Sequence, residues 1–293
     1  MKQLLILSGK GGTGKTTVAS CFIELMQTKA YADCDVEAPN LHITATPKGK
    51  GTKEDYFGLP KARINQEACI ACMNCYNSCR FGAISLDEKS KKPYIKELLC
   101  EGCGVCNLVC PSDAIVMEEH KNGDTIVYKQ EPFFSTAKLK MGAGASGRLV
   151  SEVKKNLKTI VPKEWIREDD RVAIIDGSPG IGCPVIASLS GVDMVLIVTE
   201  PTLSGKSDMI RILETAAHFK INTVVCINKY DICMELTEDL KMYCKEREIP
   251  VVGVIPYDKM ASVAINEGKS LIQYDSPSGV AIRSICKNTM ERL

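Results

Sequence analysis

The sequence predicts an α/β protein whose doubly wound, mostly parallel sheet is interrupted by a small inserted α+β domain. Short Val- and Ile-rich runs alternate with helix-like stretches, the pattern of a parallel sheet covered on both faces. A cysteine-dense stretch with little apolar periodicity, from Cys69 to Cys110, separates the first of these units from the others. The sheet-forming domain is therefore expected to be discontinuous, with parts at 1–59 and 121–293 and an insert at 60–120.

Composition narrows the class of protein. The 293 residues are 45% hydrophobic and 25% charged, enough apolar material for one large domain or two modest ones. Lys and Arg total 37 against 36 for Asp and Glu, a balance that disfavours a nucleic-acid binder. The first apolar run is too short for a signal peptide or a membrane span, so we expect a cytoplasmic protein with no stable membrane insertion. Fifteen cysteines in that compartment indicate metal or redox chemistry, not disulfides.

The first elements are a strand at 2–8, a glycine-rich turn, and a helix. The helix has one apolar face at a helical period, made by Val18, Ala19, Phe22, Ile23 and Met26. The runs VAIID, MVLIV, TVVCIN and VVGVIP predict later strands, with helices at SDMIRILETAAHF and ELTEDLKMYCKER. MGAGASGR at 141–148 predicts a mobile loop at the domain edge. The C-terminal AIRSICKNTMERL lacks a basic face and aromatic anchors, so it is expected to cover the sheet and not to bind membrane.

A phosphate-binding loop stands between the first strand and its helix. It consists of Gly9, Lys10, Gly11, Gly12, Thr13, Gly14, Lys15, Thr16 and Thr17. Glycines allow backbone N–H groups to converge on phosphate oxygens, and the helix N-terminus adds partial positive charge. We expect Lys15 to neutralise the terminal phosphates and Thr16 to bind Mg²⁺.

Lys10, a second lysine inside this loop, resembles the deviant Walker A motif of the MinD/ParA/Mrp superfamily, which includes the nitrogenase iron protein. The resemblance implies that Lys10 reaches the partner's nucleotide across a homodimer. It extends to Asp33-Cys34-Asp35 and to the segment from Asp176 to Gly180. By position, Asp35 is assigned to orienting the attacking water and Asp176 to the magnesium shell.

Asn228, in the segment Asn228-Lys229-Tyr230-Asp231 after the run TVVCI, is expected to read the nucleotide base. This spelling matches the guanine-reading motif of GTPases. In the superfamily that the chain resembles, an asparagine at this place serves adenine equally well. ATP is therefore favoured, and GTP stays open.

The cysteine spacing predicts two 4Fe-4S clusters. Two C-x2-C-x2-C-x3-C runs, 31 residues apart by their first cysteines at 69 and 100, match two-cluster ferredoxins, in which the fourth cysteine of each run crosses to the other cube. The first cluster is assigned Cys69, Cys72, Cys75 and Cys110; the second is assigned Cys79, Cys100, Cys103 and Cys106. Arg80 stands where a proline often follows the fourth cysteine of such a run. Zinc is the competing interpretation, since CxxC pairs also bind it.

Together these motifs resemble a MinD-superfamily ATPase with an inserted ferredoxin domain. The resemblance implies a nucleotide-switched homodimer that serves iron-sulfur or metallocofactor maturation, or ATP-gated electron transfer to a client or redox partner. The alternative is a ParA/MinD-type positioning ATPase with a redox-sensing insert. Cys183 stands seven residues after Asp176, where the nitrogenase iron protein holds its bridging cluster; it is either a dimer-bridging ligand or a small buried residue. Six further cysteines are expected to be inert, namely Cys21, Cys34, Cys226, Cys233, Cys244 and Cys286.

Overall fold

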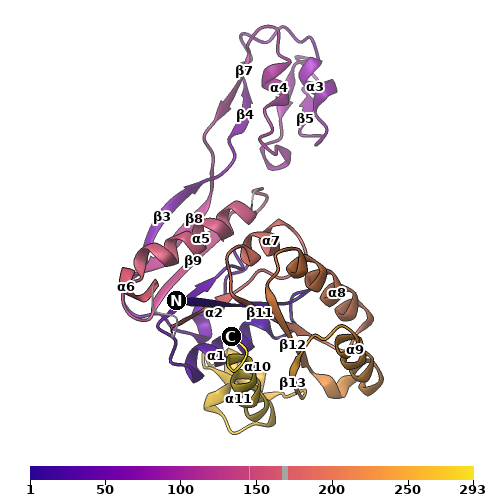
Figure 1. The fold of residues 1–293 in the computed structure, drawn as a ribbon. Helices are drawn as coiled ribbons and strands as arrows, with labels where there is room; N and C mark the ends of the chain where they lie inside the picture. Colours follow the sequence, from indigo (N-terminus) through magenta and orange to yellow (C-terminus); the bar gives the residue numbers. More distant parts are fainter. Residues whose placement is uncertain (145, 167–170) are drawn as a thin grey trace. The chain divides into compact units, whose positions relative to one another are not determined.

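The computed structural model describes residues 1–144, 146–166 and 171–293 of the chain. These residues form two compact units, each built from more than one segment. The first unit comprises 1–53, 125–138 and 147–293, and the second comprises 54–124 and 139–146. Figure 1 shows the elements of both units in sequence colours.

A nine-stranded sheet dominates the fold, and at least seven of its strands are parallel. Its order is β13 (Val251–Ile255), β12 (Asn222–Asn228), β11 (Met194–Thr199), β1 (Lys2–Leu7), β10 (Val172–Asp176), β2 (Ala30–Asp33), β9 (Phe133–Leu139), β8 (Lys121–Tyr128) and β3 (Thr52–Phe57). Each pair of adjacent strands from β13 to β9 is parallel. The α/β class with a large, mostly parallel sheet is therefore confirmed, as are the four strands expected after the insert.

The central strands are apolar because both of their faces are covered. All six residues of β11 are buried. Along β1, Leu4 and Ile6 join one core cluster with α1, while the intervening Leu5 and Leu7 point to the opposite face, as the two-residue period of a strand requires. The sheet therefore has a core on each side.

Helices cover both faces of this sheet (Figure 1). On the face of Leu4 lie α1 (Lys15–Leu25), α2 (Leu41–Thr44), α10 (Met260–Asn266), the 3-10 turn η3 (Leu271–Gln273) and α11 (Pro277–Met290). The remaining helices outside 54–124 are α5 (Ser146–Ile160), α6 (Lys163–Ile166), α7 (Cys183–Leu189), α8 (Leu203–His218) and α9 (Met234–Glu246), with the 3-10 turn η2 (Tyr230–Ile232) before α9.

The C-terminal helix α11 covers the sheet, as expected. Ile282 and Ile285 are each 1% exposed, and the helix lies against β13 and α1. Among the described residues, no helix is long and apolar enough to cross a membrane.

Helix α5 begins inside the stretch that was expected to be a mobile loop, and it also contacts α7. The stretch 141–148 is not a loop throughout, because Ser146–Arg148 already belong to α5, whose buried leucines and valines drive helix formation; Ala145 lies outside the described residues. The buried Lys154 donates from Nζ to the carbonyl oxygens of Ser188 and Ser190, both at 2.6 Å, at the C-terminal end of α7. Burial lowers the pKa of Lys154 to about 8.

The second unit contains two short antiparallel pairs, β4 (Lys61–Ile64) with β7 (Ile115–Glu118), and β5 (Ile84–Leu86) with β6 (Pro93–Ile95). It also holds α3 (Asn74–Ser78), α4 (Val105–Leu108) and the 3-10 turn η1 (Glu97–Leu99). Its small core consists of Ala62, Cys75, Ala83, Ile84, Cys100 and Ile115.

The internal repeat is also a repeat of backbone conformation. Three positions have positive φ in both copies: Ala71 and Gly102 (55° and 68°), Met73 and Gly104 (66° and 76°), and Gly82 and Asp113 (61° and 51°). Ala71 and Met73 adopt it without glycine's freedom, a conformation that costs energy and recurs at functional sites. Each cysteine run is therefore folded into the same tight loop.

Candidate functional site

The phosphate-binding loop joins the end of β1 to the start of α1. Gly12 and Gly14 have φ of 81° and 86°, a region that glycine enters without steric cost. Gly14 is the N-cap of α1 and has no side chain, so the N–H groups of the first turn have no capping side chain as an acceptor. This is a ready anion site.

A buried ion pair lies beneath the loop. Lys15 Nζ is 2.5 Å from Asp176 Oδ1, and the Thr16 hydroxyl donates to Asp176 Oδ2 at 2.7 Å. Burial lowers the pKa of Lys15, but the charge and hydrogen bond of Asp176 outweigh it and hold that pKa above its usual value. The three sequence-predicted residues therefore meet at one point, with the donor and acceptor types that a magnesium-bound triphosphate requires.

Two aspartates at the end of β2 have different surroundings. The Asp33 carboxylate is fully buried and accepts from three backbone N–H groups, those of Asp35 (3.0 Å), Asn40 (2.9 Å) and Leu41 (3.0 Å). Burial and the nearby Asp176 raise the pKa of Asp33 to about 7. Asp35 is only partly buried and lines the cavity beside the loop. Asp33 thus fixes the segment that presents Asp35.

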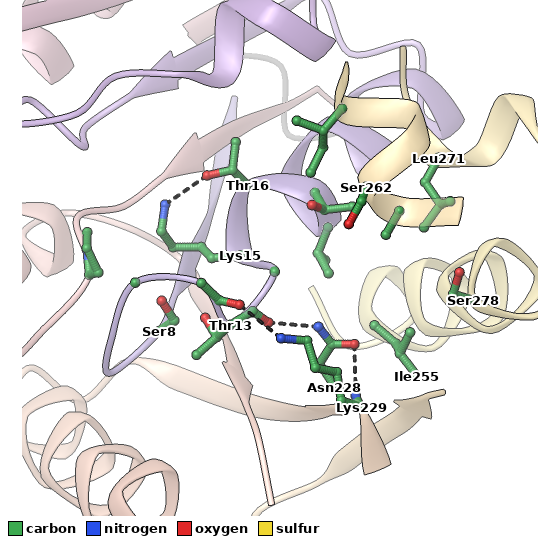
Figure 2. A pocket seen from close by; sticks show the side chains of 18 of the residues that line it. Ser8, Thr13, Lys15, Thr16, Asn228, Lys229, Ile255, Ser262, Leu271 and Ser278 are labelled. Atoms are coloured by element: carbon green, nitrogen blue, oxygen red, sulfur yellow. Dashed lines mark hydrogen bonds between the residues drawn. The ribbon is translucent and has the colours of Figure 1, made fainter. Parts of the chain in front are cut away.

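A cavity of about 570 Å³ opens beside the loop. Phosphate-loop residues line one end, including Thr13, Lys15 and Thr16, and Asn228 lies beside Thr13 at this end (Figure 2). An apolar wall is supplied by Ile255, Pro256, Ala261, Ile265, Leu271 and Ile282. A polar end for phosphates and an apolar end for a ring suit a nucleotide.

The family assignment rests on comparison with known proteins. The model of the CobQ/CobB/MinD/ParA nucleotide binding domain (CbiA) matches residues 4–272. The chain belongs to this family.

The nucleotide-binding domain of this family implies ATPase activity for this chain. The chain is 33% identical over 234 residues to MJ0578, an uncharacterized protein of Methanocaldococcus jannaschii, covering 78% of each chain. It is 21% identical over 296 residues to the Nubp1 homolog of Drosophila sechellia, named a cytosolic Fe-S cluster assembly factor, covering 98% of this chain and 81% of that one. The cell division ATPase MinD of Pyrococcus furiosus shares its fold, with a TM-score of 0.54 and 17% identity over 100% of this chain and 99% of that chain.

In this CobQ/CobB/MinD/ParA member, the second loop lysine contacts the start of α8. Lys10 Nζ lies 3.4 Å from the hydroxyls of Thr202 and Ser204, and 3.6 Å from Glu200 Oε2. Glu200 also binds Lys229 Nζ at 2.5 Å, so one carboxylate holds two lysines of the site. Glu200 was not predicted from the sequence, although its position directly after the buried strand β11 was a signal for it.

The Asn228 amide contacts the phosphate loop. Its Nδ2 donates to the Thr13 carbonyl at 2.8 Å, and its Oδ1 accepts from the Lys229 N–H (Figure 2). Asp231, the acidic residue of the guanine-like spelling, is exposed and accepts from the Tyr257 N–H at 2.7 Å. It does not line the cavity.

The eight motif cysteines of the second unit line two separate small cavities. Cys69, Cys72, Cys75 and Cys110 surround one, and Cys79, Cys100, Cys103 and Cys106 surround the other. Each set combines three cysteines of one run with the fourth of the other. Within the described ranges, no group of three His, Cys, Asp or Glu side chains converges tightly enough to hold a single metal ion.

The remaining cysteines differ in exposure. Of the six expected to be inert, five are buried and Cys233 is half-buried. Cys183 is exposed at the first turn of α7, so its interpretation as a small buried residue is wrong. Its carbonyl oxygen lies close to α5, since a Cβ on Gly147 would be 2.9 Å from it. Its role as a dimer-bridging ligand stays a prediction.

Proposed function

We propose that this ATPase carries two 4Fe-4S clusters in its second unit and that an ATP-switched homodimer couples hydrolysis to iron-sulfur work. That work is electron transfer to a partner protein, or maturation of a client's iron-sulfur or metal cofactor. The observation that carries the proposal is the partition of eight cysteines into two cavities, each bordered by four thiols in the crossed arrangement.

The residues around the cavities suit clusters. Each iron of a cube binds one thiolate, so the four sulfurs surround a space and do not converge on a point. Burial raises the pKa of Cys110, but hydrogen bonds with the side chain and backbone of Ser112, together with the Ala114 N–H that donates to Cys110 Sγ at 3.3 Å, outweigh it and lower that pKa. When bound, the clusters supply one-electron redox chemistry. The left-handed turns at Ala71 and Met73 bend the backbone around the first site.

The nucleotide site supplies the switch. We assign Thr16 and Asp176 to Mg²⁺, Lys15 to the terminal phosphates, and Asp35 to the attacking water. Bound phosphate would replace contacts that Lys15 and Thr16 now make with Asp176, and hydrolysis would restore them. Family members are commonly dimeric, and in the dimer Lys10 is assigned to the partner's nucleotide. The position of Asp231 outside the cavity favours ATP over GTP.

The two kinds of iron-sulfur work differ in the fate of the iron. Four protein ligands for each cluster leave no open coordination position, which favours stable clusters and electron transfer. Likeness to an Fe-S cluster assembly factor favours maturation. The fold of MinD favours a third function, a positioning ATPase, but such a switch has no use for two clusters.

Anaerobic purification followed by iron quantitation and EPR, with and without Mg-ATP, tests the proposal. We expect about eight irons per chain, signals of two reduced clusters, and a change in spectrum or reduction rate with ATP. Cys72→Ser and Cys103→Ser should each disturb one cluster, and Cys226→Ser, at a buried cysteine outside the motifs, serves as the matched control.

Iron-free or zinc-loaded protein that is folded and binds ATP would refute the clusters. Iron that moves to an acceptor protein during turnover would identify maturation, whereas iron that stays while its oxidation state changes would identify electron transfer. ATP-dependent binding to vesicles or DNA by protein without clusters would favour the positioning function.

A further inference from the structure

A buried lysine distinguishes the two cysteine-lined cavities. Lys61, the first residue of β4, is 8% exposed, and its Nζ donates a hydrogen bond to the carbonyl oxygen of Cys100. Cys100 lines the cavity assigned to the second cluster. In the part of the chain that the structure describes, no carboxylate forms an ion pair with Lys61.

The internal repeat supplies a counterpart that lacks this contact. Residues 31 positions apart correspond in the two copies, so Lys61 corresponds to Lys92. Lys92 is more exposed, and its Nζ donates to the carbonyl of Gln66 at 2.5 Å, not to a cysteine. The two copies therefore differ in charge. Among the residues that the structure describes, a buried ammonium group is bound to the backbone of a cysteine at the second cavity and not at the first.

Reduction adds one negative charge to a cluster, so a nearby cation stabilises the reduced form. The effect depends on the dielectric around the charge. A buried ammonium group acts through protein, whereas an exposed charge is screened by water and salt. Glu101 is the charged residue in the lining of the second cavity, and Arg80, of opposite charge, follows the cavity-lining Cys79 in sequence. Both side chains are exposed, so water and salt screen their charges more strongly than that of the buried Lys61.

We propose that Lys61 makes the second cluster the more easily reduced of the two, so that electrons from an external one-electron donor collect there. The inference rests on the proposed function, because it requires both clusters to be present. With both clusters bound, the unit would have a direction, because an added electron would be more stable on the second cluster than on the first.

A redox titration of the full chain, prepared anaerobically and followed by EPR with dithionite as the reductant, tests this assignment. Wild-type protein should show two midpoint potentials. Lys61→Met should shift the higher one to more negative values and leave the lower unchanged. Lys92→Met, the matched control, should move neither by a comparable amount. Cys103→Ser, which alters one ligand of the second cluster, identifies the signal that belongs to it.

The outcomes separate this inference from the proposed function. Full iron content with no shift in Lys61→Met, or an equal shift of both potentials, overturns the role of Lys61 alone. Wild-type protein without iron overturns both. Should Lys61→Met lose iron, Lys61→Arg, which keeps the charge, and Lys61→Gln, which removes it but can still donate, must differ in the higher potential; equal potentials would contradict the inference.

Discussion

Two lysines of one loop differ in what surrounds them. The side chain of Lys15 is 6% exposed and pairs with the buried Asp176, whereas that of Lys10 is 36% exposed. We expect Lys15→Met to lower the free energy of unfolding by about 3 kcal/mol, because it leaves a buried carboxylate unpaired. It should also abolish ATP binding. Urea denaturation and nucleotide titration measure the two effects.

Lys10→Met is the matched control. The Lys10 side chain is itself partly exposed, and its partner Glu200 keeps a second lysine, Lys229, so the loss in unfolding free energy should stay within about 1 kcal/mol. ATP binding to a single chain should persist while hydrolysis falls, if Lys10 acts across the dimer. Equal losses of stability in the two variants would contradict the difference in burial.

Asp33 predicts a pH dependence of stability. Its pKa is about 7 in the folded chain and near 3.8 ordinarily, so the folded state holds a proton that the unfolded state has released between these values. The contribution of Asp33 to the free energy of unfolding is therefore greatest below pH 4 and is lost as the pH rises toward 7. In Asp33→Asn, the fall of unfolding free energy between pH 5 and pH 7 should be less steep than in wild type. An unchanged slope would refute the assignment.

At this scale the sequence predicted residue types better than their orientation. The loop spacing located Lys15 and Thr16, and the position after a buried strand located Asp176. Nothing in the string Asp33-Cys34-Asp35 indicates which carboxylate is buried, since both lie at the end of the same strand. That choice depends on backbone N–H groups of residues 35, 40 and 41, which only the folded segment brings together. Glu200 was missed for the same reason, because its two lysine partners are remote in sequence.

Among the elements, α11 offers a test of its place in the core. Ile285 is 1% exposed and contacts β13, where a Cβ on Gly253 would lie 2.5 Å from its Cγ1. We expect Ile285→Ala to cost about 2–5 kcal/mol of unfolding free energy. Val280→Ala, on the same helix but 61% exposed, should change it by less than about 0.5 kcal/mol. Similar small effects at both positions would indicate that α11 is not part of the core.

Elements with a continuous apolar run were predictable, and those without one were not. The strands β10 to β13 were predictable directly from their Val and Ile content. β3, with the sequence TKEDYF, has five exposed residues of six, and β8 begins KNGD, so neither has an apolar signature. Such strands form because a neighbouring strand offers hydrogen bonds, which is a tertiary effect.

For the whole molecule, the position of the insertion within the sheet predicts that it can be removed. β3 and β8, which lead into and out of 54–124, are neighbours in the sheet, so residues 53 and 125 are close in space. A chain in which a short Asn-Gly turn replaces 54–124 should keep ATP affinity within about threefold, because the first unit has its own core. It should contain no iron.

Nucleotide titration of this shortened chain measures its ATP affinity, and iron quantitation measures whether it contains iron. The control is a full-length chain with all eight motif cysteines changed to serine, which should also bind ATP and lack iron. If only the shortened chain fails to bind ATP while the serine variant succeeds, the two units depend on each other for folding.

The contacts between α5 and α7 couple the movements of the two helices. With its C-terminal carbonyls tied to Lys154 and its first residue against Gly147, α7 cannot slide without carrying α5 along. α7 starts seven positions beyond Asp176, and α5 has 15 residues, roughly 22 Å at 1.5 Å each. A small displacement at the start of α7, close in sequence to Asp176, would thus be carried by α5 to a point about two nanometres away.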